Sequence, residues 1–149
     1  MYLKEKLHKK CEAFINARLL TVQNAINEIQ KSLLTETKSS AGDKHETGRA
    51  MLQLEREKAG QQLMEIQKIK EILSRIDTKK KSAVICLGSI IYTPNAIYFL
   101  AISAGKIKLE GELFYAISTG TPIGKLLLSK RVGENIMFRN QNIKIEKIL

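Results

Sequence analysis

Two carboxylates three residues apart, Asp43 and Glu46, are the residues of this sequence best suited to chemistry. Residues three apart on a helix share a face, so the two side chains can converge on one cation. Hard divalent metals such as magnesium prefer oxygen ligands, but two carboxylates are too few to complete a cage. The pair therefore indicates half of a metal site, with the remaining ligands supplied by another molecule.

The same spacing also has a purely structural explanation. An Asp at a helix start, followed three residues later by Glu, is typical of a capping box, in which both side chains accept hydrogen bonds from backbone N–H groups. His45 stands between the two acids and could add a metal ligand or shuttle a proton, or be placed there by chance. From spacing alone, the helix cap and the metal half-site both stay open.

The surrounding pattern predicts that the acidic pair lies at the tip of a helical hairpin. Apolar residues step by four and three from Leu3 to Leu33, as a coiled-coil seam requires, and a second apolar pattern ends at Ile76. The stretch between the two apolar patterns is poor in apolar residues and rich in residue types that cap helices. We therefore expect residues 1–77 to form two antiparallel helices, with the acidic tip at 42–46.

Beyond a short basic linker at residues 78–82, the period of the sequence changes. Runs rich in β-branched and aromatic residues alternate with turn residues, which predicts short strands, the first at Ala83–Tyr92 and the last at Ile143–Ile148. One short helix is expected where Thr121 precedes Pro122, because Pro is favoured at the first helical position. The fold class is α+β: a helical coiled-coil hairpin, then a small antiparallel sheet domain at 83–149.

Charge is the main compositional signal. The 149 residues include 25 Lys and Arg against 15 Asp and Glu, a formal net charge of +10. Residues 1–80 hold 16 basic and 11 acidic residues, and residues 81–149 hold 9 and 4, so each half carries +5. An excess spread in this way favours contact with nucleic acid, an acidic membrane or a polyanionic complex, or serves solubility.

The sequence also bears on the compartment. No apolar run approaches the ~20 residues that span a bilayer, and the charged N-terminal stretch is unlike a secretory signal. Cys11 and Cys86 lie far apart, without the spacing of a metal or redox motif. We therefore expect two reduced core thiols and a cytoplasmic protein with no membrane partner.

The segment Ser118–Glu134 resembles the Ser-Pro-Ile-Gly-Lys-Ala-Leu-Leu-Gly-Lys-x-Val-Gly-Asp signature of the Gre-type (GreA/GreB) transcript cleavage factors. The tip sequence Gly-Asp-Lys-His-Glu at 42–46 is similar to the Gly-Asp-x-x-Glu tip of the same family. Both motifs occur in the order and at the separation found in the family, so the resemblance covers nearly the whole chain. It implies an FKBP-like fold for residues 83–149.

The resemblance also implies a function as a transcription elongation factor. Gre-type factors bind bacterial RNA polymerase, dock at the rim of its secondary channel and insert their coiled coil toward the active centre. Asp43 and Glu46 would help to hold a magnesium ion shared with the polymerase, and this chain alone would bind none stably. The polymerase would then cut the 3′ end of a backtracked RNA by two-metal hydrolysis, so the chain itself would not be an enzyme. The residues expected to dock on the polymerase are Pro122, Ile123, Gly124 and Lys125.

The tip departs from the family pattern after the second acid. The family continues with Asn and then an aromatic residue, whereas this chain continues with Thr47, Gly48 and Arg49. Arg49 and Lys44 are candidates to contact phosphates of the nascent RNA, although Arg49 could instead neutralise the acids. A secondary-channel regulator that does not stimulate cleavage is therefore the alternative function.

Two further alternatives concern other residues. A thiol-dependent acyl-transfer enzyme would need an activated Cys beside a His, and His8 lies three residues before Cys11, but Cys11 continues the apolar seam. Lys125, Lys130 and Arg131 could dock on an acidic partner or simply be solvated at a helix end. We expect a monomer, although an exposed coiled-coil face could also pair between chains.

Overall fold

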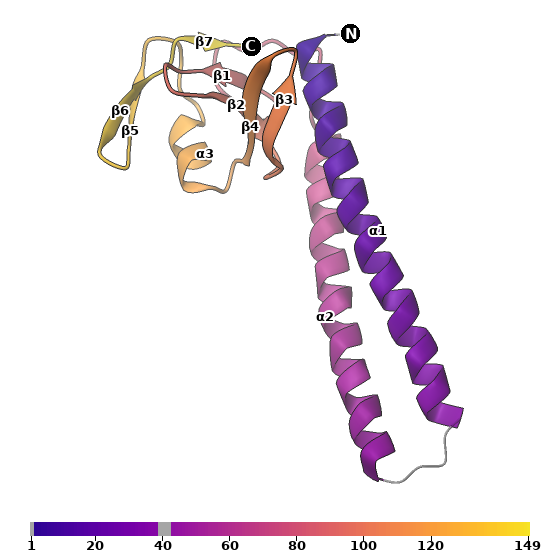
Figure 1. Ribbon diagram of the computed structural model, residues 1–149. Coiled ribbons are helices and arrows are strands. Elements are labelled where there is room, and N and C mark those ends of the chain that lie inside the picture. The colour runs from indigo at the N-terminus through magenta and orange to yellow at the C-terminus, as the bar shows by residue number, and fades with distance from the viewer. Residues whose placement is uncertain (1, 39–42) are drawn as a thin grey trace. The chain divides into compact units, whose positions relative to one another are not determined.

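The computed structural model describes residues 2–38 and 43–149, without the side chains of residues 36–38 and 43–45. Two long helices come first, and strands with one short helix follow (Figure 1). This is the order of elements that the sequence predicts, and it confirms the α+β fold class.

The helices α1 (Leu3–Lys38) and α2 (Asp43–Ser74) belong to two compact units. Residues Ile15–Ile69 form the first unit, in which the two helices run antiparallel (Figure 1). The second unit combines the residues up to Phe14 with Lys70–Leu149, so both helices have their other ends in the unit that holds the sheets.

The predicted apolar seam accounts for the packing within Ile15–Ile69. Ile15 and Ile26 of α1 and Ala59 and Ile66 of α2 are buried, because their spacing keeps them on the facing sides of the helices. The other seam residues of this unit are half-buried. Two residues of the second apolar pattern do not pack in this way, since Met51 and Leu54 are more than half exposed.

The sheet domain has a five-stranded sheet. Its strand order is β3 (Gly105–Leu109), β4 (Glu112–Ser118), β2 (Ile97–Ala101), β1 (Ile90–Tyr92) and β7 (Lys147–Ile148). All neighbouring strands are antiparallel except β2 and β4, which run parallel. The chain leaves β2, forms the outer strand β3 and returns as β4, which lies between β3 and β2. The predicted antiparallel sheet thus has one parallel pair.

The predicted last strand, Ile143–Ile148, is divided between two sheets. Its first part lies in β6 (Gln141–Lys144), which forms a hairpin with β5 (Asn135–Phe138), and its last part is β7. Between them, the N–H of Ile145 donates to the Glu134 carbonyl oxygen at 2.9 Å, and the Ile145 carbonyl accepts from the Gly133 N–H at 2.8 Å. These bonds extend the hairpin pairing beyond Asn135 and Lys144, with two residues, Gly133 and Glu134, opposite the buried Ile145, as in a β-bulge.

The predicted first strand is much shorter than Ala83–Tyr92. Only Ile90–Tyr92 is strand, preceded by an isolated bridge between Val84 and Arg131. Gly88 interrupts the run because its φ of +95° favours glycine, and a Cβ there would meet Cγ2 of Ile76 at 2.9 Å. The backbone therefore turns at Gly88 before it enters the sheet.

The hydrophobic core of the sheet domain lies under the short helix α3 (Pro122–Leu127). It consists of buried residues from the strands, from α3 and from the connecting segments: Ile85, Ile91, Leu100, Ile123, Leu127, Ile136, Ile143 and Ile145. Leu7 and Cys11 of α1, Leu73 of α2 and Ile76 just after α2 are also buried, outside this cluster. In the part of the chain that the structure describes, no helix is long and apolar enough to cross a membrane.

Candidate functional site

The acidic pair lies at the start of α2. The helix begins at Asp43, whose side chain, like those of Lys44 and His45, lies outside the described residues. Glu46 follows in the first turn and is exposed. The two acids therefore occupy backbone positions three apart on one helix, as the hairpin prediction requires, while the choice between cap and metal half-site stays a prediction.

Arg49 lies one turn beyond Glu46 and links the two helices. It is half-buried, and its Nη1 donates a hydrogen bond to the carbonyl oxygen of Leu33 at 3.2 Å. At least one function of this side chain is therefore to hold α2 against α1. Its predicted contact with RNA phosphate stays a prediction, and so does that of Lys44.

The donor chemistry of the acidic pair suits a hard cation, but the number of donors does not complete a site. Carboxylate oxygens are the ligands that Mg²⁺ prefers, and Mg²⁺ requires near-octahedral coordination. Over residues 2–38 and 43–149, apart from the undescribed side chains, no three His, Cys, Asp or Glu side chains are grouped closely enough to hold a metal ion. The exposed Glu46 and its partner at position 43 thus fit a magnesium ion only if a second molecule adds ligands.

The second predicted site is the start of α3, where a capping hydroxyl fixes the helix to the end of β4. The Thr121 Oγ1 accepts from the Gly124 N–H at 3.2 Å and donates to the Ser118 carbonyl oxygen at 2.7 Å. Pro122 occupies the first helical turn, as predicted. The sequence Thr-Pro therefore sets both the starting point and the direction of α3.

The four residues predicted to dock on a partner divide into two groups. Ile123 and Gly124 are buried, whereas Pro122 and Lys125 are exposed. Gly124 leaves no room for a side chain, because a Cβ there would overlap the Ser118 carbonyl oxygen and lie 2.8 Å from the Thr121 Oγ1. The buried pair therefore positions α3, and the exposed pair is available for contact with another molecule.

Exposed apolar residues near α3 were missed by the sequence reasoning. Leu126, Leu128, Val132 and Met137 are 37%, 38%, 57% and 63% exposed, respectively, in or beside α3 and the neighbouring strand β5. A signal was present, because three consecutive leucines on a short helix cannot all face one core. Only Leu127 is buried among them. We call the exposed Pro122 and Lys125, together with these four apolar residues, the α3 surface.

The thiol chemistry considered from the sequence finds no support in the geometry of Cys11. Burial raises the pKa of its thiol to about 12, so the nucleophilic thiolate is suppressed. His8 is engaged elsewhere: its Nδ1 lies 2.7 Å from Oε1 of Glu12, and its Nε2 lies 2.9 Å from the carbonyl oxygen of Leu73. Cys11 is a core residue, as the apolar seam predicts.

Solved structures with similar folds include two of a Gre-type homologue. The first is the GreA factor homolog 1 (Gfh1) protein of Thermus thermophilus, with 21% sequence identity, 91% of this chain and 92% of that chain covered, and a TM-score of 0.36. The second is the transcription factor Gfh1, with 21% identity, 90% of each chain covered and a TM-score of 0.34. No family model and no curated protein matches the sequence. At these TM-scores the likeness carries no conclusion about function.

Proposed function

We propose that this protein is a transcription elongation factor that binds bacterial RNA polymerase through its secondary channel and stimulates cleavage of backtracked RNA 3′ ends. The observation that carries the proposal is the Gre-type signature at Ser118–Glu134. Within this signature, Thr121 caps α3, and Gly124 occupies a position where there is no room for a Cβ atom. The acidic pair, whose backbone lies at the start of α2, would be the tip motif that the same resemblance implies.

Docking is assigned to the α3 surface. Its apolar residues would pack on the polymerase, and Lys125 would face acidic groups of the channel rim, which gives electrostatic selection of the partner. Ile123 and Gly124 contribute indirectly, because their burial fixes the orientation of α3.

The proposed chemistry belongs to the polymerase and is completed by the tip. Magnesium, when bound between the two proteins, would supply charge neutralisation and an activated water for phosphodiester hydrolysis. Asp43 and Glu46 would supply oxygen ligands to that shared site and orient the attacking water. Because Glu46 is exposed at the start of a helix, its carboxylate is accessible to a second macromolecule. Lys44 would add a positive charge toward the nascent RNA.

The direct test is transcript cleavage in a backtracked elongation complex with magnesium. Asp43→Asn/Glu46→Gln should abolish the stimulated cleavage while polymerase binding is retained, because the amides are similar in size but are poor metal ligands. Glu55→Gln/Glu57→Gln is the matched control, since it removes the same charge from exposed positions further along α2. Equal cleavage by both double variants would disprove the assigned role of the tip.

Binding is measured separately, by co-sedimentation or fluorescence anisotropy with core polymerase. Lys125→Glu should weaken binding, and Lys106→Glu, at an exposed site on β3, should not. Wild-type protein that binds without stimulating cleavage would support the alternative of a non-cleaving channel regulator. Absence of binding would reject both functions.

A further inference from the structure

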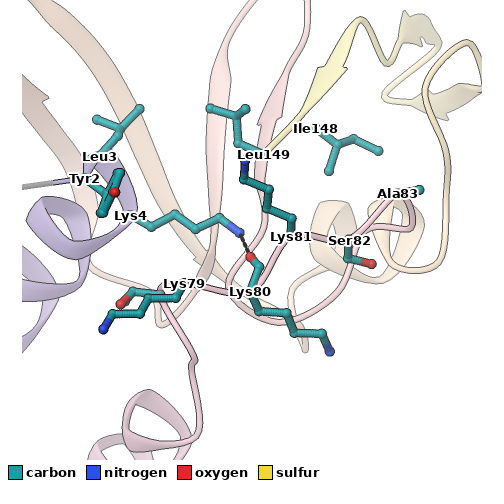
Figure 2. Close-up of a pocket in the computed structure, with 11 residues that line it drawn as sticks. Tyr2, Leu3, Lys4, Lys79, Lys80, Lys81, Ser82, Ala83, Ile148 and Leu149 are labelled. Atoms are coloured by element: carbon teal, nitrogen blue, oxygen red, sulfur yellow. Dashed lines mark hydrogen bonds between the residues drawn. The ribbon is translucent and has the colours of Figure 1, made fainter.

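A groove lies beside the basic linker, within the unit that contains the sheets. We call it the linker groove: it is lined by Tyr2 and the first two residues of α1, by residues 78–83, by Ile148 of β7 and by Leu149 (Figure 2). Its volume is about 870 Å³. Neither the tip of the hairpin nor the α3 surface contributes to it, so the proposed polymerase function leaves it unexplained.

The linker side of the groove is strongly basic. Lys79, Lys80 and Lys81 are exposed, and none of them forms an ion pair with a carboxylate among the described residues. Asp77 is the nearby acid, and its Oδ1 accepts from the backbone N–H of Lys79 at 3.0 Å, which shapes the turn. The turn therefore presents consecutive ammonium groups that form no ion pair with a carboxylate in the described part of the chain.

Lys4 adds a fourth positive charge across the groove. Its Nζ donates to the carbonyl oxygen of Lys80 at 2.8 Å (Figure 2). Burial lowers the pKa of Lys4, opposed in part by Cys86 and Asp77. An anionic group placed in the groove would relieve this penalty by stabilising the charged form.

The opposite side of the groove is the edge of a sheet. β7 is the last strand in the order of the five-stranded sheet, so only one of its sides is paired. Reciprocal hydrogen bonds join Ile90 and Leu149, which makes the intervening pair, Ile91 and Ile148, a non-hydrogen-bonded pair. The backbone N–H and C=O of Ile148 therefore point away from β1, toward the open side of the sheet.

We propose that the linker groove binds an extended, acidic segment of a partner protein, which adds as a strand beside β7. The edge backbone of Ile148 would supply main-chain hydrogen bonds, the apolar side chains lining the groove would accept aliphatic residues, and the lysines would pair with Asp or Glu. A nucleic acid fits less well. The described lining contains no arginine and has only Tyr2 as an aromatic, whereas single strands are usually held by several stacking rings.

The test uses a short fluorescent peptide of alternating Asp and Val, titrated against the full chain by anisotropy at low salt. Lys79→Glu/Lys81→Glu should weaken binding by about tenfold or more, because two attractive contacts become repulsive. Lys106→Glu/Lys108→Glu is the matched control, with the same change in net charge at exposed positions on β3, the other edge of the sheet. Its affinity should stay within about twofold of wild type, allowing for long-range attraction.

Two further readouts separate strand addition from simple charge attraction. A peptide N-methylated at alternate residues cannot donate to the edge of β7 and should bind much more weakly, and the unmodified peptide should shift the NMR signal of the Ile148 amide. Equal binding of both peptides, an equal loss in the two lysine variants, or absence of binding would overturn the proposal. It would also fail if single-stranded DNA displaced the peptide from the groove at lower concentration than an acidic peptide competitor.

Discussion

The Nε2 atom of His8 lies 2.9 Å from the carbonyl oxygen of Leu73, which joins the first turns of α1 to the last turn of α2. Carbonyl groups in the last turn of a helix lack a partner within that helix, so a side chain from elsewhere can satisfy them. His8 is held in place by Glu12, whose Oε1 lies 2.7 Å from its Nδ1. The imidazole therefore acts as a cap that crosses between helices.

Replacing His8 by Ala should lower the free energy of unfolding by up to about 1 kcal/mol, because the Leu73 carbonyl would keep only the long 3.3 Å hydrogen bond from the Ile76 N–H. Urea denaturation at neutral pH measures the change. Lys9→Ala, at the next and exposed position of α1, controls for the loss of a long polar side chain. An equal effect of the two substitutions would show that the His8 cap contributes nothing.

Cys11 should make stability depend on alkaline pH. Its pKa is raised from 9.0 to about 12 by burial, so between these values the unfolded chain loses a proton that the folded chain keeps. The free energy of unfolding should then fall as pH rises above 9, by at most about 1.4 kcal/mol per pH unit from this group. The free energy of unfolding of Cys11→Ala, measured over the same pH range, contains the contribution of the tyrosines but not that of Cys11. The difference between the two pH profiles therefore isolates the thiol, and parallel profiles would contradict the prediction.

Local signals predicted the helices better than the pairing of strands. Thr121 and Pro122 act through atoms only a few residues away, so the sequence was sufficient to place the start of α3. The parallel pairing of Phe99 with Ala116, by contrast, depends on where β3 and β4 return after leaving β2. No turn motif encodes such a long-range choice. The α3 surface was missed for a related reason, since exposure of Leu126 depends on which face the core already occupies.

Gly124→Ala should destabilise the sheet domain by about 1–3 kcal/mol. The added methyl group would overlap the Ser118 carbonyl oxygen, which belongs to the backbone and cannot move without disturbing β4. Gly120→Ala is the matched control, because a Cβ there would meet only the Ser118 Oγ, at an ordinary 3.8 Å. Thermal unfolding of both variants measures the difference, and equal melting temperatures would refute the steric argument.

Replacement of Ser129 by glycine should stabilise the folded protein. Its φ of +71° lies in the left-handed region, where an L side chain costs about 1 kcal/mol, and the Gre-type signature has Gly at this position. Ser129→Gly should therefore raise the free energy of unfolding by somewhat less than that amount, since glycine also gains entropy in the unfolded chain. Ser129→Ala keeps the Cβ and should give no such gain. A stabilisation shared by both variants would point to the hydroxyl and not to the backbone.

Arg49 allows the structural and RNA-binding roles of the tip to be separated. Because its Nη1 bonds to the Leu33 carbonyl, Arg49→Met should speed hydrogen exchange of nearby α2 amides in the free protein, consistent with a local loss of up to about 1 kcal/mol. Arg56→Met, two turns along the same helix, is the control. Unchanged exchange together with reduced RNA cleavage in the polymerase complex would contradict the structural role of Arg49. It would indicate instead that Arg49 acts through contact with RNA phosphate.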